Sequence, residues 1–243
     1  MGAKKITFYI DGFNFYFGIR RKCRIDPQWG MAYWINVVKL CESFLAEDQE
    51  LQKVIYFTSS PLSPEKNSRQ SAFLNANKAL SGDRFEIVRG KFLEKTVVCP
   101  NCKYAIPKPE EKRTDVNISV RMLEDCFRQQ TDIIALISAD SDLIPPMASI
   151  MKYFDSIAIK VYFPPANHSR DISDFLLGNK SKKPVLLEKN LKRFVNAAMP
   201  DDVGKYSIPI KWKTKRDIAL AAIAKTSQDK KRIIWQHPKL ETV

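Results

Sequence analysis

Short apolar runs alternate along the chain with segments in which apolar residues recur at helical spacing. The apolar runs cover residues 4–10, 53–60, 132–138 and 156–163, and a partly alternating stretch over 84–98 is expected to form a strand and a hairpin. Runs of this kind are typical of strands that are buried on both faces of a parallel sheet. Helical spacing is found at residues 31–46, 64–80, 114–130 and 141–154. Strands that alternate with helices of this length predict an α/β fold with right-handed crossovers and a central, mostly parallel sheet.

Local signals refine three of these elements. Ser63 and Pro64 are suited to the N-cap and the first residue of the helix over 64–80. Residues 99–112 are crowded with proline and cysteine and are expected to form a loop. The helix over 114–130 is expected to be capped by Thr114 and to bury one apolar stripe. That stripe consists of Val116, Val120, Leu123 and Phe127.

The composition is that of a globular protein with an excess of positive charge. Hydrophobic residues make up 44% of the 243 residues, and 40 Lys and Arg against 27 Asp and Glu give a net charge of +13. Residues 1–178 hold 24 basic and 21 acidic residues, whereas residues 179–243 hold 16 and 6. We therefore expect one domain over 1–178 and a basic C-terminal extension over 179–243 that suits nucleic acid. No apolar run reaches the roughly 18 residues of a membrane span, so no membrane partner is expected.

The cysteines indicate a reducing compartment. Their number is odd at five, and the N-terminus does not resemble a signal peptide, so we expect a cytoplasmic protein with reduced thiols. Cys99 and Cys102 form a C-x-x-C pair that has three interpretations. The pair is half of a Zn²⁺ site that is completed by Cys23 or by the second subunit of a homodimer, a pair of free loop thiols, or an oxidisable pair.

Acidic residues follow the predicted strands where an α/β sheet places its ligands. Asp11 ends the first strand, Asp140 and Asp142 end the strand over 132–138, and Asp115 begins the preceding helix. Ligands bind beyond the carboxyl ends of parallel strands. If the first strand and the strand over 132–138 are neighbours, the four carboxylates converge.

Converging carboxylates repel one another, so a hard divalent cation is expected between them. Oxygen-only clusters suit Mg²⁺ or Mn²⁺, and such metal centres most often serve phosphate chemistry. The alternative for each single Asp is a helix cap or a turn. Asn14, Ser138 and Ser141 are also candidates, because each can bind a carboxylate or a phosphate, or hold a turn.

Three stretches of the chain, 9–19, 110–125 and 136–147, resemble in order and spacing the signatures of NYN domains. The resemblance covers about residues 5–178 and is strongest to the LabA-like branch within the PIN-like nucleases. It implies a PIN-like three-layer α/β/α fold and metal-dependent cleavage of RNA. The catalytic and metal-binding carboxylates that it implies are Asp11, Asp115, Asp140 and Asp142, with Asn14 as a supporting residue.

One position departs from the family pattern. Many relatives carry an acidic residue where this chain has Arg121, which implies fewer metal ligands or a lost activity. Lys112 and Arg113 are suited to a phosphate contact or to solvent. Trp212 and Trp235 interleave with basic residues. This pattern is equally typical of a segment that binds single-stranded RNA and of a basic tail whose tryptophans pack on the domain.

These observations predict a Mg²⁺- or Mn²⁺-dependent endoribonuclease that acts on single-stranded RNA. The main alternative is an RNA-binding regulatory protein that cleaves poorly because of Arg121. A third interpretation, a phosphatase-like Mg²⁺ enzyme, lacks a D-x-D pair at the first strand.

Overall fold

A six-stranded parallel sheet forms the centre of the molecule. The computed structural model describes the backbone of residues 2–236 and their side chains other than those of 92–95, 107–111 and 227–236. The strand order is β3-β2-β1-β6-β7-β8, and every neighbouring pair is parallel. The strands are β1 (Lys4–Asp11), β2 (Gln49–Thr58), β3 (Phe85–Arg89), β6 (Ile133–Ile137), β7 (Ala158–Phe163) and β8 (Val185–Leu186).

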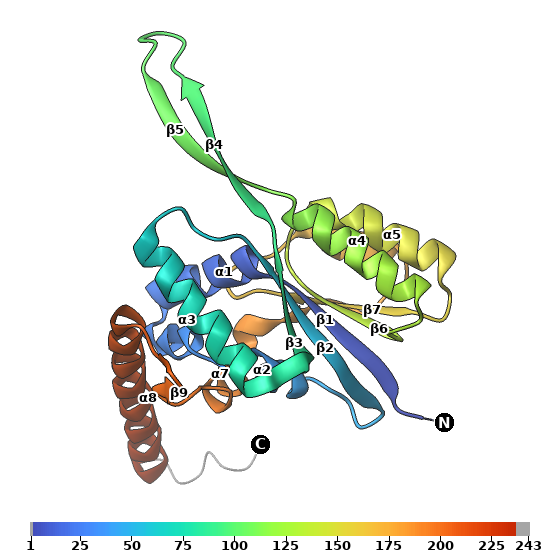
Figure 1. Cartoon of the computed structure of the whole chain (residues 1–243). Coiled ribbons are helices and arrows are strands. Elements are labelled where there is room, and N and C mark those ends of the chain that lie inside the picture. The colour runs from blue at the N-terminus through green and yellow to red at the C-terminus, as the bar shows by residue number, and fades with distance from the viewer. Residues whose placement is uncertain (1, 237–243) are drawn as a thin grey trace.

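Helices cover both faces of this sheet, which confirms the predicted three-layer α/β/α architecture (Figure 1). One face carries α4 (Thr114–Phe127), α5 (Ile144–Tyr153) and α6 (Arg170–Gly178). The other carries α1 (Gly12–Ile25), α2 (Val37–Glu42), α3 (Pro64–Ser81), α7 (Leu191–Asn196), α8 (Ile210–Gln236) and the 3-10 helix η1 (Pro27–Tyr33). Alternate residues of β1 point to the two faces, so Phe8 and Tyr9 belong to separate apolar cores.

The residues that follow Gly178 continue the same core. Strand β8 extends the central sheet, and Phe194 stacks on Phe15 of α1. Trp212 of α8 is only 6% exposed and stacks on Tyr33 of η1. The 3-10 helix η4 (Leu187–Lys189) directly follows β8, and a small hairpin of β9 (Asp202–Val203) and β10 (Tyr206–Ser207) lies between α7 and α8. The side chain of Trp235 and residues 237–243 lie outside the described part of the chain.

Several elements differ from the sequence prediction. The stretch 99–112 is not a loop throughout, because β5 (Ala105–Lys112) pairs with β4 (Lys91–Val98) in an antiparallel hairpin. Helix α1 was not predicted, and the expected helix over 31–46 is divided between η1 and α2. The 3-10 helix η2 (Gly82–Arg84) follows α3, which begins at Pro64 as predicted and ends at Ser81, one residue beyond the predicted end.

The apolar stripe predicted for α4 is wrong. Val116, Val120 and Phe127 are exposed, and the buried line of the helix contains Ile118 and Met122. Both lines have helical spacing, so periodicity alone does not distinguish them. The predicted cap is also shifted, since Arg113 occupies the N-cap position in place of Thr114.

Within the described residues, none of the helices has both the length and the apolar composition that crossing a bilayer requires.

Candidate metal centre

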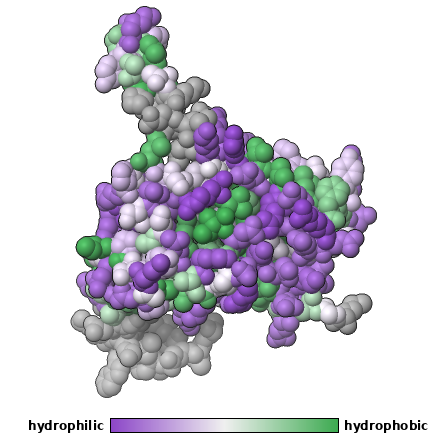
Figure 2. Space-filling view, viewed as in Figure 1, coloured by the Kyte–Doolittle hydropathy of each residue, from purple (hydrophilic) through white to green (hydrophobic). Residues whose placement is uncertain are grey.

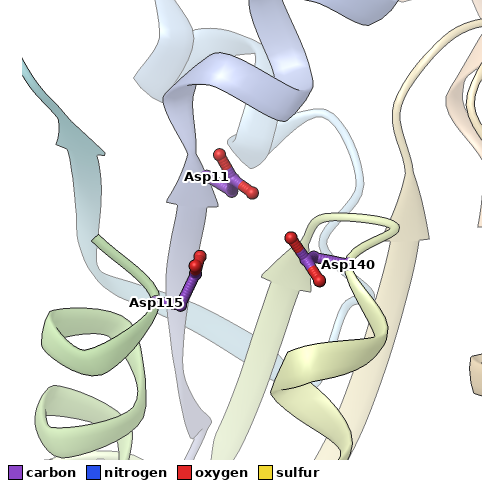
Figure 3. Close-up of side chains that lie close together, drawn as sticks. All are labelled: Asp11, Asp115 and Asp140. Carbon is purple, nitrogen blue, oxygen red and sulfur yellow. The ribbon is translucent and has the colours of Figure 1, made fainter. Parts of the chain in front are cut away.

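Three carboxylates from separate elements converge at the carboxyl edge of the sheet. Asp11 ends β1, Asp115 lies in the first turn of α4, and Asp140 follows β6 (Figure 3). One oxygen of each lies within 4.8 Å of the others. The convergence follows from the strand order, because β1 and β6 are hydrogen-bonded neighbours whose carboxyl ends lie at the same edge.

Close packing fixes the position of Asp11. Its carboxylate is almost fully buried, with Oδ1 accepting the Asn14 N–H at 3.0 Å and Oδ2 accepting the Ser138 hydroxyl at 3.1 Å. The next residue, Gly12, has no room for a side chain. A Cβ there would lie 2.4 Å from Cε1 of Tyr56 and 2.6 Å from the carbonyl oxygen of Phe57. The start of α1 is therefore pressed directly onto β2.

A chain of hydrogen bonds connects the loops around the site. The Asp140 N–H donates to Ser138 Oγ at 3.1 Å, and Asp140 Oδ1 accepts the Asp142 N–H at 3.0 Å. Asn14 Oδ1 accepts the Ala139 N–H at 3.3 Å and a second bond from the Asn167 side chain. Asp11 and Asp140 therefore act as helix caps and still direct carboxylate oxygens into the common space.

The electrostatics and the dimensions of the cluster suit a cation. Burial, followed by the charges of Asp140 and Asp142, raises the pKa of Asp115. A divalent cation would remove that repulsion. In an octahedral Mg²⁺ site adjacent ligands lie about 2.9 Å apart and opposite ligands about 4.2 Å apart, so oxygens that lie within 4.8 Å of one another would approach by up to about 2 Å around the ion. The three carboxylates could therefore hold Mg²⁺ or Mn²⁺.

The model of the NYN domain matches residues 5–174, which is more than two thirds of the chain. The chain belongs to the NYN domain family. This membership gives it a nuclease-type fold and makes the acidic cluster the natural candidate for its active centre.

Two individual proteins are also similar to this NYN protein. A 6-hydroxy-3-succinoylpyridine 3-monooxygenase from Pseudomonas putida is 25% identical over 71% of this chain, and the match spans 64% of that relative's length. A solved structure of a protein of unknown function from Vibrio parahaemolyticus is 16% identical with a TM-score of 0.46. That match covers 76% of this chain and 93% of the Vibrio chain.

The remaining predicted residues of the NYN site lie within three positions of Asp115 or Asp140 in the sequence. Asp142 is exposed in the 3-10 helix η3 (Ser141–Leu143) and lies outside the group of three, although its charge acts on Asp115. Ser141 is partly exposed beside it. Lys112 and Arg113 are exposed just before α4, and Arg113 has a φ of 77°. The structure thus brings together Asp11, Asp115 and Asp140, supported by Asn14 and Ser138.

Arg121, the departure from the family pattern, is bound to other acidic residues. Its Nε lies 3.0 and 3.1 Å from the carboxylate oxygens of Asp125, and its terminal nitrogens bind Glu86 of β3. The Tyr9 hydroxyl donates to the same Asp125 at 2.7 Å. The guanidinium is therefore engaged in a network of its own.

Sequence reasoning missed a groove beside the metal centre. A cavity of about 760 Å³ lies between α1, α3 and α8, and Gly12, Tyr56 and Thr58 line its end at the carboxyl ends of β1 and β2. All charged residues among its described lining are basic: Arg20, Arg24, Lys66, Arg69, Lys211 and Lys215. Aromatic residues complete the lining, among them Phe13, Tyr16, Phe17, Tyr33 and Trp212. The sequence held one signal, since Phe13, Phe17, Arg20 and Arg24 share a helical face.

The C-x-x-C pair lies far along the chain's projecting hairpin, at the turn between β4 and β5. All five cysteines are free thiols. Cys23, one of the two candidates for completing a zinc site, hydrogen-bonds with Tyr33 of η1. Across the described residues, the aspartate cluster is the only group of three metal-ligating side chains.

Proposed function

We propose that this NYN protein is a LabA-like endoribonuclease that uses Mg²⁺ or Mn²⁺ to hydrolyse single-stranded RNA. The products are expected to carry 5′-phosphate and 3′-hydroxyl ends. The observation that supports this proposal is the convergence of Asp11, Asp115 and Asp140 in a chain of the NYN family. When bound, the cation lowers the pKa of a water molecule and neutralises charge that develops on the phosphoryl group.

The residues of the chain then have separate roles. Asp11, Asp115 and Asp140 hold the cation, and Ser138 keeps Asp11 and the Asp140 backbone in register. Asn14 fastens the loops after β6 and β7 to α1. The exposed carboxylate of Asp142 is suited to orient a water molecule at the rim of the cluster.

The groove supports single-stranded RNA as the substrate. Its cationic residues match a phosphate backbone, and the partly exposed rings of Phe13, Tyr16 and Phe17 offer stacking surfaces for bases. Base stacking contributes about 1–3 kcal/mol per base and does not require a particular sequence. Trp212 and Tyr33 form the buried floor, so their contribution is to shape the groove.

A cleavage assay tests the proposal. Labelled single-stranded RNA, single-stranded DNA and duplexes are incubated with the full chain in Mg²⁺, Mn²⁺ or EDTA. We expect RNA cleavage that needs metal and is lost in Asp140→Asn, but is retained in Asp174→Asn, a matched change at an exposed aspartate of α6. Tight, salt-sensitive RNA binding without cleavage in any metal would refute the nuclease and favour the RNA-binding regulator.

A binding assay tests the groove separately. Arg20→Ala combined with Lys211→Ala removes two exposed cations from the groove, and Lys152→Ala on α5 is the control. If both cations contact phosphates, the slope of log K against log salt becomes shallower by about 1.4, at about 0.7 per contact. An unchanged slope would place RNA elsewhere on the surface.

The same groove supports a second candidate function. The relative from Pseudomonas putida is named for a pyridine compound with a succinoyl side chain, which combines an aromatic ring with an acid group. A cavity of about 760 Å³ with aromatic and cationic lining has the size and chemistry for such a ligand. Calorimetric titration with 6-hydroxy-3-succinoylpyridine distinguishes the two. Saturable binding without RNA cleavage would favour the small aromatic anion.

A further inference from the structure

The β4–β5 hairpin is built differently from the rest of the molecule. Its eight cross-strand pairs run without interruption from Lys91↔Lys112 to Val98↔Ala105, and it forms a sheet of its own. The ribbon projects away from the α/β body (Figure 1). An isolated two-stranded ribbon is at best marginally stable in water. Its end is therefore a place where contacts from outside the body are expected.

The turn at the end of the hairpin presents two sulfurs together. The Cys99 N–H donates to the Tyr104 carbonyl at 2.9 Å, and the Lys103 N–H donates to the Cys99 carbonyl at 3.0 Å. Lys103 has a φ of 57°, which closes the turn tightly. The backbone N–H groups of Cys102 and Asn101 donate to the Cys99 sulfur, and so does the Cys102 thiol.

This arrangement corresponds to half of a tetrahedral thiolate site. With Zn–S bonds of about 2.3 Å, two sulfurs of such a site lie about 3.8 Å apart. The tight turn between Cys99 and Lys103 holds both cysteines at the same end of the hairpin. Backbone N–H groups that point at a sulfur favour the thiolate, which is the form that binds metal.

The described part of the chain supplies no further ligands at this turn. Cys41 and Cys126 are buried in the body, and Cys23 is bound to Tyr33. His168 is paired with Glu188 in the body. A closed structural zinc site needs four ligands, and a two-fold axis through the metal would supply the missing two from a second copy.

An apolar face surrounds the two cysteines. Val97 and Ile106 pair across the hairpin and are 43% and 50% exposed, and Tyr104 is 68% exposed. Because residues two apart in a strand share a face, these three lie on the same side as Cys99. Figure 2 shows hydrophobic surface at this end of the hairpin, distant from the body. A second hairpin packed against this face would remove the exposed apolar surface from water.

We propose that Cys99 and Cys102 bind Zn²⁺ and that the same two cysteines of a second copy of this chain complete a tetrathiolate centre. The thiols give up their protons to solvent as four Zn–S bonds form, and no redox change takes place. A Zn²⁺ ion with four thiolates carries a net charge of −2, which the two Lys103 side chains of the dimer would offset. The hairpin thereby becomes a metal-closed dimerisation arm.

Zinc content and molar mass of the full chain test this proposal. Protein purified with Zn²⁺ is analysed by elemental analysis and by light scattering coupled to gel filtration. We expect one zinc per two chains and the mass of a dimer. EDTA should convert the dimer to a monomer, and added Zn²⁺ should restore it. Cys99→Ser and Cys102→Ser should lose both zinc and dimer, whereas Cys23→Ser, a thiol in the body, keeps both.

Three results would overturn the proposal: no zinc in the wild-type chain, one zinc per monomeric chain, or a dimer that persists in Cys99→Ser. Thermal unfolding of the serine variants in EDTA should match that of the wild type in EDTA, which separates loss of the site from misfolding. Cobalt-loaded protein should show the absorption of a four-thiolate site. These measurements use no RNA, so their failure and that of the nuclease proposal are independent.

Discussion

Replacing Arg121 by alanine should destabilise the fold through a buried aspartate. In the native structure Asp125 is only 4% exposed and binds the Arg121 guanidinium and the Tyr9 hydroxyl. Of these two partners, only the Tyr9 hydroxyl remains for the buried carboxylate once the guanidinium is removed. It also removes the guanidinium from Glu86.

The structure sets the size of this effect. Breaking a buried ion pair from one side typically costs about 3–5 kcal/mol. The Arg121 side chain is 21% exposed and that of Glu86 is 32% exposed, so water replaces part of the lost interaction. We therefore expect the free energy of unfolding to fall by about 2–3 kcal/mol. At about 2–4 °C per kcal/mol for a chain of this size, Tm should fall by about 4–12 °C.

Urea unfolding followed by circular dichroism measures this loss, and Arg170→Ala provides a matched control. Arg170 and Asp174 form a pair at the same i,i+4 spacing, but their side chains are 92% and 67% exposed and 3.5 Å apart. Breaking that pair should cost less than about 0.5 kcal/mol. Equal losses in the two variants would refute the argument that burial of Asp125 makes the Arg121 network important.

Two further predictions address the site and the pH dependence. Gly12→Ala should destabilise the fold by about 1–3 kcal/mol, because the new Cβ overlaps Tyr56 and the β2 backbone. The same change should lower RNA cleavage, because it displaces Asp11. Gly178→Ala is the control: nothing lies within 4 Å of its Cβ, so neither stability nor cleavage should change in the same unfolding and cleavage assays. Hydrogen bonds from Arg121 lower the pKa of Glu86 in the folded chain below its usual 4.5. The stability that the charged Glu86 contributes is therefore complete above about pH 4.5 and is lost as the pH falls through the folded pKa. Wild type should exceed Glu86→Gln in urea midpoint at neutral pH, and the difference should shrink below pH 4.5; a difference that grows on acidification would contradict this sign.

The sequence was sufficient for every strand of the central sheet except β8 and for the three carboxylates. The runs that form β1 and β6 are apolar throughout, so both strands had to be buried in a parallel sheet, and Asp11 and Asp140 directly follow them. To predict the position of Asp115, it was enough to know where α4 begins. What remained open was whether β1 and β6 are neighbours, which depends on packing across the whole sheet.

The second strand of the hairpin, β5, was missed because proline is usually a sign against a strand. Pro107 and Pro109 lie within β5, opposite Thr96 and Glu94 of β4. Residues two apart in a strand direct their backbone nitrogens to the same edge. In a two-stranded ribbon the outer edge needs no hydrogen-bond donors, so both prolines are tolerated there.

Arg121 illustrates a different limit of sequence reasoning. The family pattern showed a basic residue in place of an acidic one and suggested a damaged metal centre. The residue that decides the matter is Glu86, which lies 35 positions earlier in the chain and becomes a partner only through the pairing of β3 with β2. The long-range partner shows that the substitution belongs to a network linking α4 to the sheet.

Because the acidic centre lies beside the basic groove, we expect the effect of Mg²⁺ on RNA binding to depend on the length of the RNA. Groove and cluster adjoin, since Gly12 lines the groove and Asp11 belongs to the cluster. A short oligonucleotide that occupies only the groove meets cations and should bind equally well in EDTA and in Mg²⁺. A longer one that crosses the three carboxylates meets like charge until a cation is present, so its affinity should rise with Mg²⁺. Fluorescence anisotropy over a series of oligonucleotide lengths measures this difference in affinity. If the effect of Mg²⁺ on affinity does not depend on length, RNA bound in the groove does not extend across the metal centre, and the prediction is wrong.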